Sequence, residues 1–174
     1  MINKYYLLVL LFITLSCGRG YEEVETYVKV LRHQSPENIS LIYKQAKNLE
    51  VQVLYEAGAE PYTGKSFRNI EYWDMLDDNL KHVFQVRNQQ MNVVVPKALN
   101  QMKLLPRQNK TSWTIPEIEA FVAKHKVSSS TSDKVVFHAL FVNGAYKEGN
   151  EVMNNIIGIN ISHTTIIVIF KDVV

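Results

Sequence analysis

The sequence predicts an α/β (α+β) domain with five strands and two main helices. Strand and helix patterns alternate up to about residue 126, and three strand patterns follow with no helix between them. The chain has 174 residues, of which 47% are hydrophobic. This size fits one ordinary domain, and the hydrophobic fraction is too high for a disordered chain.

The first half of the domain is predicted to be strand, helix, strand. Val51–Tyr55 is β-branched and aromatic, and it ends at a breaker that contains glycine and proline over residues 56–61. Tyr72–Arg87 has apolar residues at helical spacing, with acidic residues in its first half and basic residues in its second, which favours a helix. Met91–Val95 is the second predicted strand, and Pro96 stops it.

A second helix is predicted after a long loop over residues 97–112, in which one helical turn is expected. Thr114 and Glu117 have the spacing of a capping box, and Pro116 lies in the first turn, where its missing N–H does no harm. We expect this helix to run to about Lys126. Its apolar face consists of Ile118, Phe121 and Val122.

Three strands are predicted at the end of the sequence. Val135–Val142 is the first of them, and a protruding loop over Asn143–Asn154 follows. Ile156–Ile161 is the next strand, Ser162–Thr164 is a tight turn, and Thr165–Phe170 is the last strand. This last strand is apolar on both sides, which is typical of a strand that is covered on both faces.

The N-terminus has the pattern of a signal peptide over residues 1–16. Lys4 precedes an apolar run from Tyr5 to Leu15, and this run is well short of the roughly 20 residues that span a bilayer as a helix. The tetrapeptide from Leu15 to Gly18 resembles the lipobox of bacterial lipoproteins, in which the cysteine, here Cys17, is acylated. Cys17 is the only cysteine, and elsewhere in an exported protein it would be an unpaired thiol. The alternative is a plain signal peptide with an incidental cysteine.

Residues 17–50 are predicted to be a lipid-anchored polar connector with helical character, and residues 51–174 to be the α/β domain. The helical character comes from apolar residues at helical spacing, Val24, Tyr27, Val28 and Leu31, and from a second candidate helix over Ile39–Leu49.

The composition and the motifs of the sequence argue against several classes of function. The formal net charge is only +2 and the basic residues are scattered, which argues against binding to nucleic acid. No HExxH motif is present, and no two histidines lie three or four residues apart. A further hypothesis, the third beside the two given below, is an enzyme whose active site combines His138 or His163 with carboxylates from elsewhere in the chain. The residues alone assemble no catalytic or metal-binding motif.

Five stretches resemble the N-terminal half of a family of exported bacterial zinc proteases, the "membrane metalloproteases", which have a metzincin-like domain. These stretches are Val51–Gly64, Trp73–Phe84, Asn109–Glu117, Phe137–Lys147 and Ile156–Lys171.

The resemblance implies the upper subdomain of a zincin, a twisted mixed five-stranded sheet with an antiparallel edge strand. In that family the edge strand aligns the substrate by backbone pairing. Here it would consist of Ile156, Ile157, Gly158, Ile159, Asn160 and Ile161. The family's active-site helix, which carries the zinc ligands and the general base, follows the strand that matches Thr165–Phe170. The sequence ends at Val174, so we expect an incomplete domain that itself binds no zinc.

Two functional hypotheses follow. The first is a lipoprotein of the bacterial cell envelope that is similar to a zinc metalloprotease but lacks peptidase activity by itself. Its partners would be the membrane, through Cys17, and a peptide or protein substrate. The alternative is a non-enzymatic surface lipoprotein whose domain is a binding module.

Overall fold

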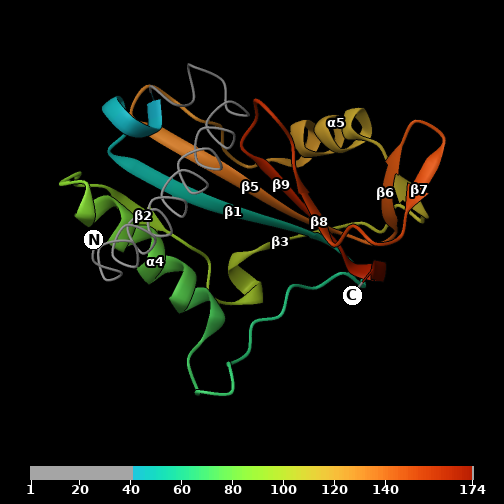
Figure 1. The fold of residues 1–174 in the computed structure, drawn as a ribbon, viewed down its shortest axis with the longest axis horizontal. Helices are drawn as coiled ribbons and strands as arrows, with labels where there is room; N and C mark the ends of the chain where they lie inside the picture. The colour runs from blue at the N-terminus through green and yellow to red at the C-terminus, as the bar shows by residue number, and fades with distance from the viewer. Residues whose placement is uncertain (1–40, 174) are drawn as a thin grey trace, which may run out of the picture.

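The computed structural model describes residues 41–173 and shows a mixed α/β (α+β) fold built on a mixed sheet (Figure 1). The strands of this sheet lie in the order β2-β1-β5-β9-β8, and β3 also pairs with β1. All pairs are parallel except β8 with β9, which is antiparallel. The strands are β1 (Asn48–Glu56), β2 (Asn92–Val94), β3 (Lys103–Leu105), β5 (Lys134–Val142), β8 (Gly158–Asn160) and β9 (Ile166–Phe170).

Two short strands share one side of the long strand β1. β2 pairs with residues 48–50 and β3 with residues 54–56 of β1. The helical turn expected in the predicted loop over residues 97–112 is present as the 3₁₀ turn Leu99–Gln101, but the loop is wrong in part because it also contains β3. A three-residue strand has little periodicity of its own and is stabilised by its partner strand, so local sequence does not reveal it.

A second, three-stranded sheet lies beyond the carboxyl ends of the main strands, at the right of Figure 1. It consists of β4 (Ser112–Trp113), β6 (Ala145–Glu148) and β7 (Glu151–Met153). The loop predicted over Asn143–Asn154 is wrong, because this segment forms the β6–β7 hairpin. Trp113 secures the small sheet, since its buried indole N–H donates to the carbonyl of Asn143 at 2.8 Å.

The helix predicted after the first strand is confirmed as α4 (Tyr72–Val86). It packs on one face of the sheet, where Phe84 joins Leu49, Val93 and Val95 in a cluster. The helix is only partly covered, since Leu76 and Val83 of the predicted apolar face are 37% and 45% exposed.

The second predicted helix is confirmed as α5 (Ile115–His125), with Thr114 as N-cap and Pro116 in the first turn. The carboxylate of Glu117 accepts hydrogen bonds from the N–H and the hydroxyl of Thr114, both at 2.9 Å. Ile118, Phe121 and Val122 are buried as expected, against side chains of β1, β5 and β9. Because strand residues alternate between faces, α4 and α5 cover opposite faces of the sheet.

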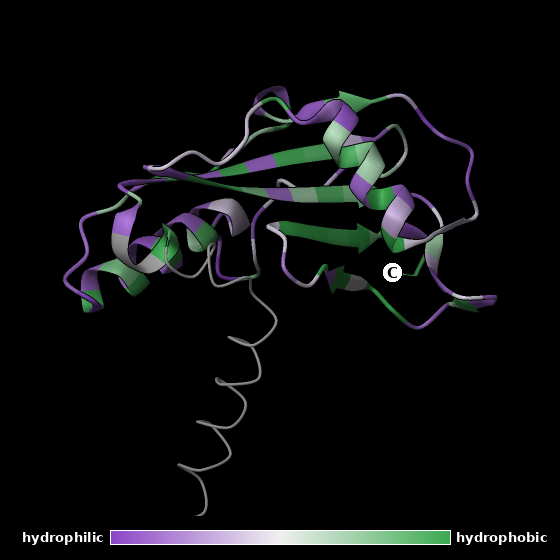
Figure 2. Ribbon diagram, turned by 90° about the horizontal axis from the view of Figure 1, so that it is seen from above, coloured by the Kyte–Doolittle hydropathy of each residue, from purple (hydrophilic) through white to green (hydrophobic). Residues whose placement is uncertain are grey.

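The last strand, β9, is fully covered on one face only. Val168 and Phe170 are completely buried in the α5 cluster. Ile167, on the opposite face, is 40% exposed. Figure 2 shows the hydrophobic colour along the central strands and the striped pattern of both helices. The sequence pattern indicated cover on both faces, and the structure corrects this for the described residues.

The start of the described region differs from the sequence prediction. Of the helix predicted over Ile39–Leu49, the described part from Leu41 onward contains a π-helical turn at Leu41–Gln45. β1 begins at Asn48, because Leu49 is buried in the cluster beneath α4. The sheet therefore includes residues assigned to the connector. The predicted signal peptide and Cys17 lie outside the described residues. No helix within residues 41–173 is long and apolar enough to cross a membrane.

Candidate peptide-binding site

The predicted edge strand lies at the edge of the main sheet. Within Ile156–Ile161 the structure forms β8 over Gly158–Asn160, and β9 is its single partner in the sheet order. Gly158 faces Ile169, and Asn160 faces Ile167. An edge strand presents a row of backbone N–H and C=O groups that another chain can pair with.

The hydrogen-bond pattern shows which backbone groups point away from β9. The carbonyl of Ile157 accepts from Phe170 N–H at 2.8 Å, and the N–H of Ile161 donates to the Ile166 carbonyl at 3.0 Å. Hydrogen-bonded pairs alternate along an antiparallel ladder. Residues 157, 159 and 161 therefore face β9, and the backbone groups of Gly158 and Asn160 face outward.

Glycine is required at position 158 because two backbones approach closely there. A Cβ atom on Gly158 would lie 2.8 Å from the carbonyl oxygen of Val168. Any side chain would push β8 away from β9. The single side chain of β8 that packs inward is Ile159, which contacts the α5 cluster.

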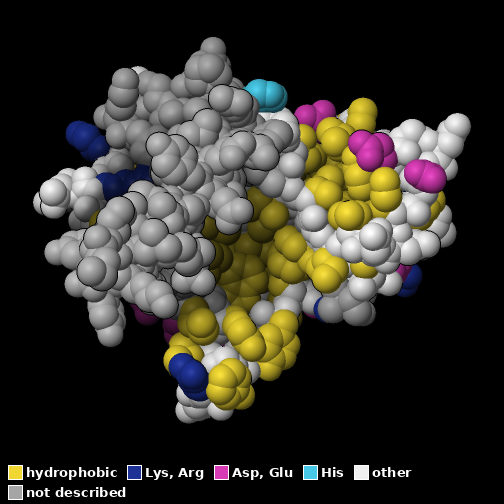
Figure 3. Space-filling view, viewed as in Figure 1, with side chains coloured by type: hydrophobic (Ala, Val, Ile, Leu, Met, Phe, Trp, Pro, Cys, Tyr) yellow, Lys and Arg dark blue, Asp and Glu magenta, His cyan; other side chains and the backbone are white. Residues whose placement is uncertain are grey.

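The sheet face on the α4 side is apolar next to this edge. Phe141, Ile169 and Gly158 lie in one row across β5, β9 and β8, and side chains that face each other across strands share a face. An apolar groove of 370 Å³ continues this surface along α4. It is lined by Pro61, Tyr62, Tyr72, Trp73, Leu76 and Phe141. Figure 3 shows hydrophobic side chains gathered in a central hollow on this face.

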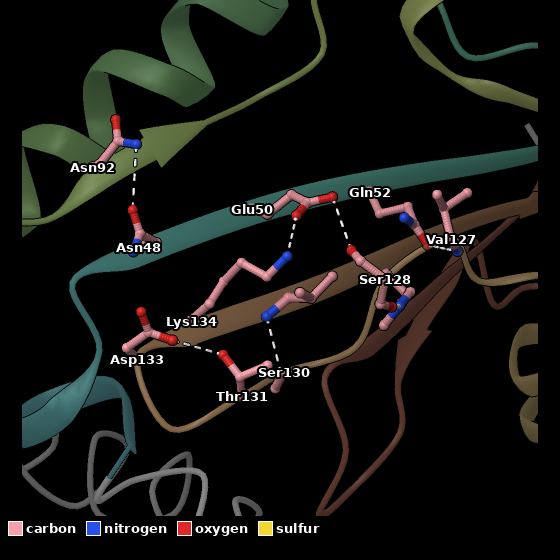
Figure 4. A network of polar contacts seen from close by, with 12 residues as sticks. Asn48, Glu50, Gln52, Asn92, Val127, Ser128, Ser130, Thr131, Asp133 and Lys134 are labelled. Atoms are coloured by element: carbon pink, nitrogen blue, oxygen red, sulfur yellow. Dashed lines mark hydrogen bonds and ion pairs between the residues drawn. The ribbon is translucent and has the colours of Figure 1, made fainter.

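The opposite face carries a polar network at the start of β1 and β5 (Figure 4). The two carboxylate oxygens of Glu50 accept hydrogen bonds, one from the Ser128 hydroxyl and one from the Lys134 ammonium, each at 3.0 Å. The N–H of Val127 donates to the side chain of Gln52 at 2.8 Å. These contacts hold the loop between α5 and β5 against the sheet.

His138 belongs to this network but forms no nucleophile–base pair in it. Its Nε2 lies 3.1 Å from the carbonyl oxygen of Ser128, whereas the Ser128 hydroxyl donates to Glu50. Burial lowers the pKa of His138, against the opposing effect of the hydrogen bond to Ser128. A catalytic serine must instead donate its hydroxyl proton to the histidine. The second histidine of the third hypothesis, His163, is in the turn before β9 with a φ of 63°.

A buried carboxylate holds the carboxyl ends of β1 and β5 together. Glu56 is 1% exposed, and one oxygen accepts from Gln108 N–H at 2.8 Å. The other accepts from the N–H and the side-chain amide of Asn143, at 2.9 and 3.2 Å. All of these donors come from loops that follow strands. Glu56 therefore fixes the loops, and both of its oxygens accept hydrogen bonds from donors within the fold.

Sequence reasoning missed the groove. Three of its aromatic residues come from the segment before α4 and from the first turn of α4, and the fourth, Phe141, comes from β5. The cluster of three aromatic residues, Tyr62, Tyr72 and Trp73, around a breaker segment was the available signal. Among the described residues no three His, Cys, Asp or Glu side chains lie together as metal ligands would.

No protein-family model, no curated protein and no solved structure matches this chain.

Proposed function

We propose that this protein is an exported lipoprotein of the bacterial cell envelope, anchored through Cys17, whose α/β domain is related to the upper subdomain of a zinc metalloprotease. In this proposal the domain binds an extended peptide along β8. The 174 residues contain no HExxH motif, so these residues account for binding and not for hydrolysis.

The observation that carries the proposal is the sheet order β2-β1-β5-β9-β8, with one antiparallel strand at the edge. In the zincin arrangement this edge strand aligns the substrate, and Gly158 and Asn160 supply outward N–H and C=O groups for that purpose. A peptide that runs antiparallel to β8 can pair with two N–H and two C=O groups there. This is recognition by strand addition, in which the main chain supplies affinity.

Zinc does not enter the proposed step. The metal would be the cofactor of the full-length family, where a helix after the last strand carries its ligands. The described residues bring no such ligand set together. We therefore derive no catalytic step through zinc for this chain.

The test uses two variants at one outward-facing position. Asn160→Pro removes the side-chain amide and a backbone N–H that points away from β9, and proline is tolerated in an edge strand in that orientation. Asn160→Ala keeps this N–H and is the matched control. Fluorescein-labelled oxidised insulin B chain serves as the peptide, and its binding is measured by fluorescence anisotropy.

We expect the wild type and Asn160→Ala to bind the peptide, and Asn160→Pro to bind at least fivefold more weakly, the effect of roughly one hydrogen bond. Equal affinity of the two variants, at equal thermal stability, contradicts pairing along β8. Cleavage of the insulin B chain by the purified protein with added ZnCl₂ contradicts the assignment of binding alone.

The alternative, a non-enzymatic surface binding module, is favoured by the closed core around α5. Leu54, Leu140, Val168 and Phe170 are fully buried without any further element. Reading the coding DNA past codon 174 separates the two proposals. An open frame with HExxH within a few dozen codons supports the protease relationship, and a stop codon with no such motif supports the binding module.

The anchor has its own test. Cys17→Ser prevents acylation, and we expect it to release the protein from the membrane fraction of expressing cells. Unchanged fractionation contradicts the lipoprotein assignment without bearing on peptide binding.

A further inference from the structure

The segment between β1 and α4 projects from the domain with its largest apolar side chains in water. Phe67 is 92% exposed and Tyr62 is 65% exposed. Ile70 and Tyr72 are 44% and 47% exposed. In Figure 3 hydrophobic side chains with a basic group beside them form the lowest projection of the molecule, where Figure 1 places this segment. We call residues 61–72 the aromatic loop.

The aromatic loop is held in shape by its own backbone. Ser66 N–H donates to the Ile70 carbonyl at 2.8 Å, and Asn69 N–H donates to the Ser66 carbonyl at 2.9 Å. Asn69 has a φ of 60°, which closes the turn. Phe67 is therefore exposed on an ordered turn.

The base of the aromatic loop is fixed to α4. The indole N–H of Trp73 donates to the Tyr62 carbonyl at 2.8 Å. The rings of Tyr62 and Tyr72 meet edge to face with centroids 5.8 Å apart. Lys65 and Glu71 form a backbone bridge and an ion pair of 3.5 Å. Because its base and its tip are already ordered, the loop loses less conformational entropy when it docks.

The cationic side chains of the aromatic loop lie beside its apolar tip. The Arg68 guanidinium lies 5.3 Å from the centroid of the Phe67 ring. The aromatic loop has two basic residues, Lys65 and Arg68, and one acidic residue, Glu71, so its formal net charge is positive. Long basic side chains can keep their charge at a polar layer while their stems lie along apolar surface.

We propose that the aromatic loop docks the domain onto an anionic lipid bilayer. The apolar residues surround a convex tip, so the tip fits a soft surface that it enters end-on and not one preformed pocket. Tyrosine is enriched at the level of lipid headgroups, and basic side chains are attracted to anionic lipids there. This inference does not depend on peptide pairing along β8, although Pro61, Tyr62 and Tyr72 of the loop also line the groove beside α4.

The test measures how deeply the tip enters lipid. The full chain with Cys17→Ser is given one new cysteine, either Phe67→Cys at the tip or Val127→Cys as the control, and is labelled with the fluorophore NBD. Val127 is 70% exposed and follows α5, on the other face of the sheet. The vesicles are phosphatidylcholine with one quarter phosphatidylglycerol, with and without a doxyl-lipid quencher.

We expect NBD at position 67 to shift to the blue and to be quenched several-fold more than NBD at position 127. Adding Arg68→Gln should raise the lipid concentration needed for half-maximal quenching by about fivefold with phosphatidylglycerol, and not with phosphatidylcholine alone. Equal quenching at the two positions overturns the proposal even if the N-terminal residues hold the protein on the vesicles. No spectral change at position 67 also overturns it.

Discussion

Replacing Glu56 with glutamine tests a buried carboxylate that joins two loops. Each carboxylate oxygen accepts hydrogen bonds from donors of a different loop, Gln108 on one side and Asn143 on the other. A glutamine side chain has one acceptor oxygen and one donor nitrogen. Whichever way the amide is turned, its NH₂ group faces a backbone N–H.

The size of the effect follows from those contacts. A hydrogen bond to a charged group contributes about 1.5–3 kcal/mol, and part of its loss is offset because glutamine is less costly to bury than a carboxylate. We therefore expect Glu56→Gln to lower the free energy of unfolding by about 2 kcal/mol. Glu56→Ala leaves the backbone N–H groups of Gln108 and Asn143 unpaired, while the Asn143 amide keeps its bond to the Ala57 carbonyl, and it should cost more than Glu56→Gln.

Urea denaturation followed by tryptophan fluorescence measures this effect. With a slope of about 2 kcal/mol per molar urea, the midpoint should fall by about 1 M. Glu119→Gln, at an exposed position on α5, is the control and should change stability by less than about 0.5 kcal/mol. A Glu56→Gln protein as stable as the wild type would refute the reasoning, because it would mean that the two oxygens do not both act as acceptors.

Three further predictions concern the core, the cap and a turn. Leu140→Ala, at a fully buried site, should destabilise the domain by about 2–5 kcal/mol in urea denaturation, and Leu104→Ala, at a site that is 58% exposed, by under about 1 kcal/mol. The ammonium of Lys110 and the Thr114 cap lower the pKa of Glu117 from 4.5 to about 2. Its stabilisation is therefore complete above pH 4.5 and lost as the pH falls toward 2, and it is at most about 1 kcal/mol because the side chain is 43% exposed. Glu117→Gln should remove this pH dependence from the unfolding midpoint, and an unaltered dependence would assign it to other groups. Gly144→Ala should lower the melting temperature by several degrees, since φ is +90° and the new Cβ would lie 2.8 Å from the backbone of Thr111; an unchanged melting temperature contradicts this close approach.

The elements that the sequence predicts correctly have strong local signals. The capping box at Thr114 and Glu117 sets the start of α5, and the β-branched run of β5 identifies a central strand. These signals work because capping and side-chain packing act over a few neighbouring residues. The elements that it misses, β3 and the β6–β7 hairpin, are short and depend on a partner strand.

Some features of the candidate site were likewise predicted from the sequence, and others were missed. The resemblance of the last strands to an exported metalloprotease family indicated an edge strand in Ile156–Ile161, and the sheet order places β8 at the edge. The close approach of Gly158 to Val168 has no local sign, because it depends on how two strands cross. The groove beside α4 was also missed, since Phe141 reaches it from far along the chain.

The sequence by itself determined both main helices and the longer strands, because apolar periodicity and caps are local properties of the chain. The tertiary structure alone decided which side chains are covered. Phe67 and Trp113 are both aromatic residues in breaker-rich segments, yet one is 92% exposed and the other is 1% exposed. Trp113 is buried because the small sheet brings it under the Asn143 carbonyl, whereas the turn at Asn69 directs Phe67 into solvent. Exposure depends on neighbours that are distant in sequence, so only the assembled fold shows which backbone edge and which aromatic residues are free to bind.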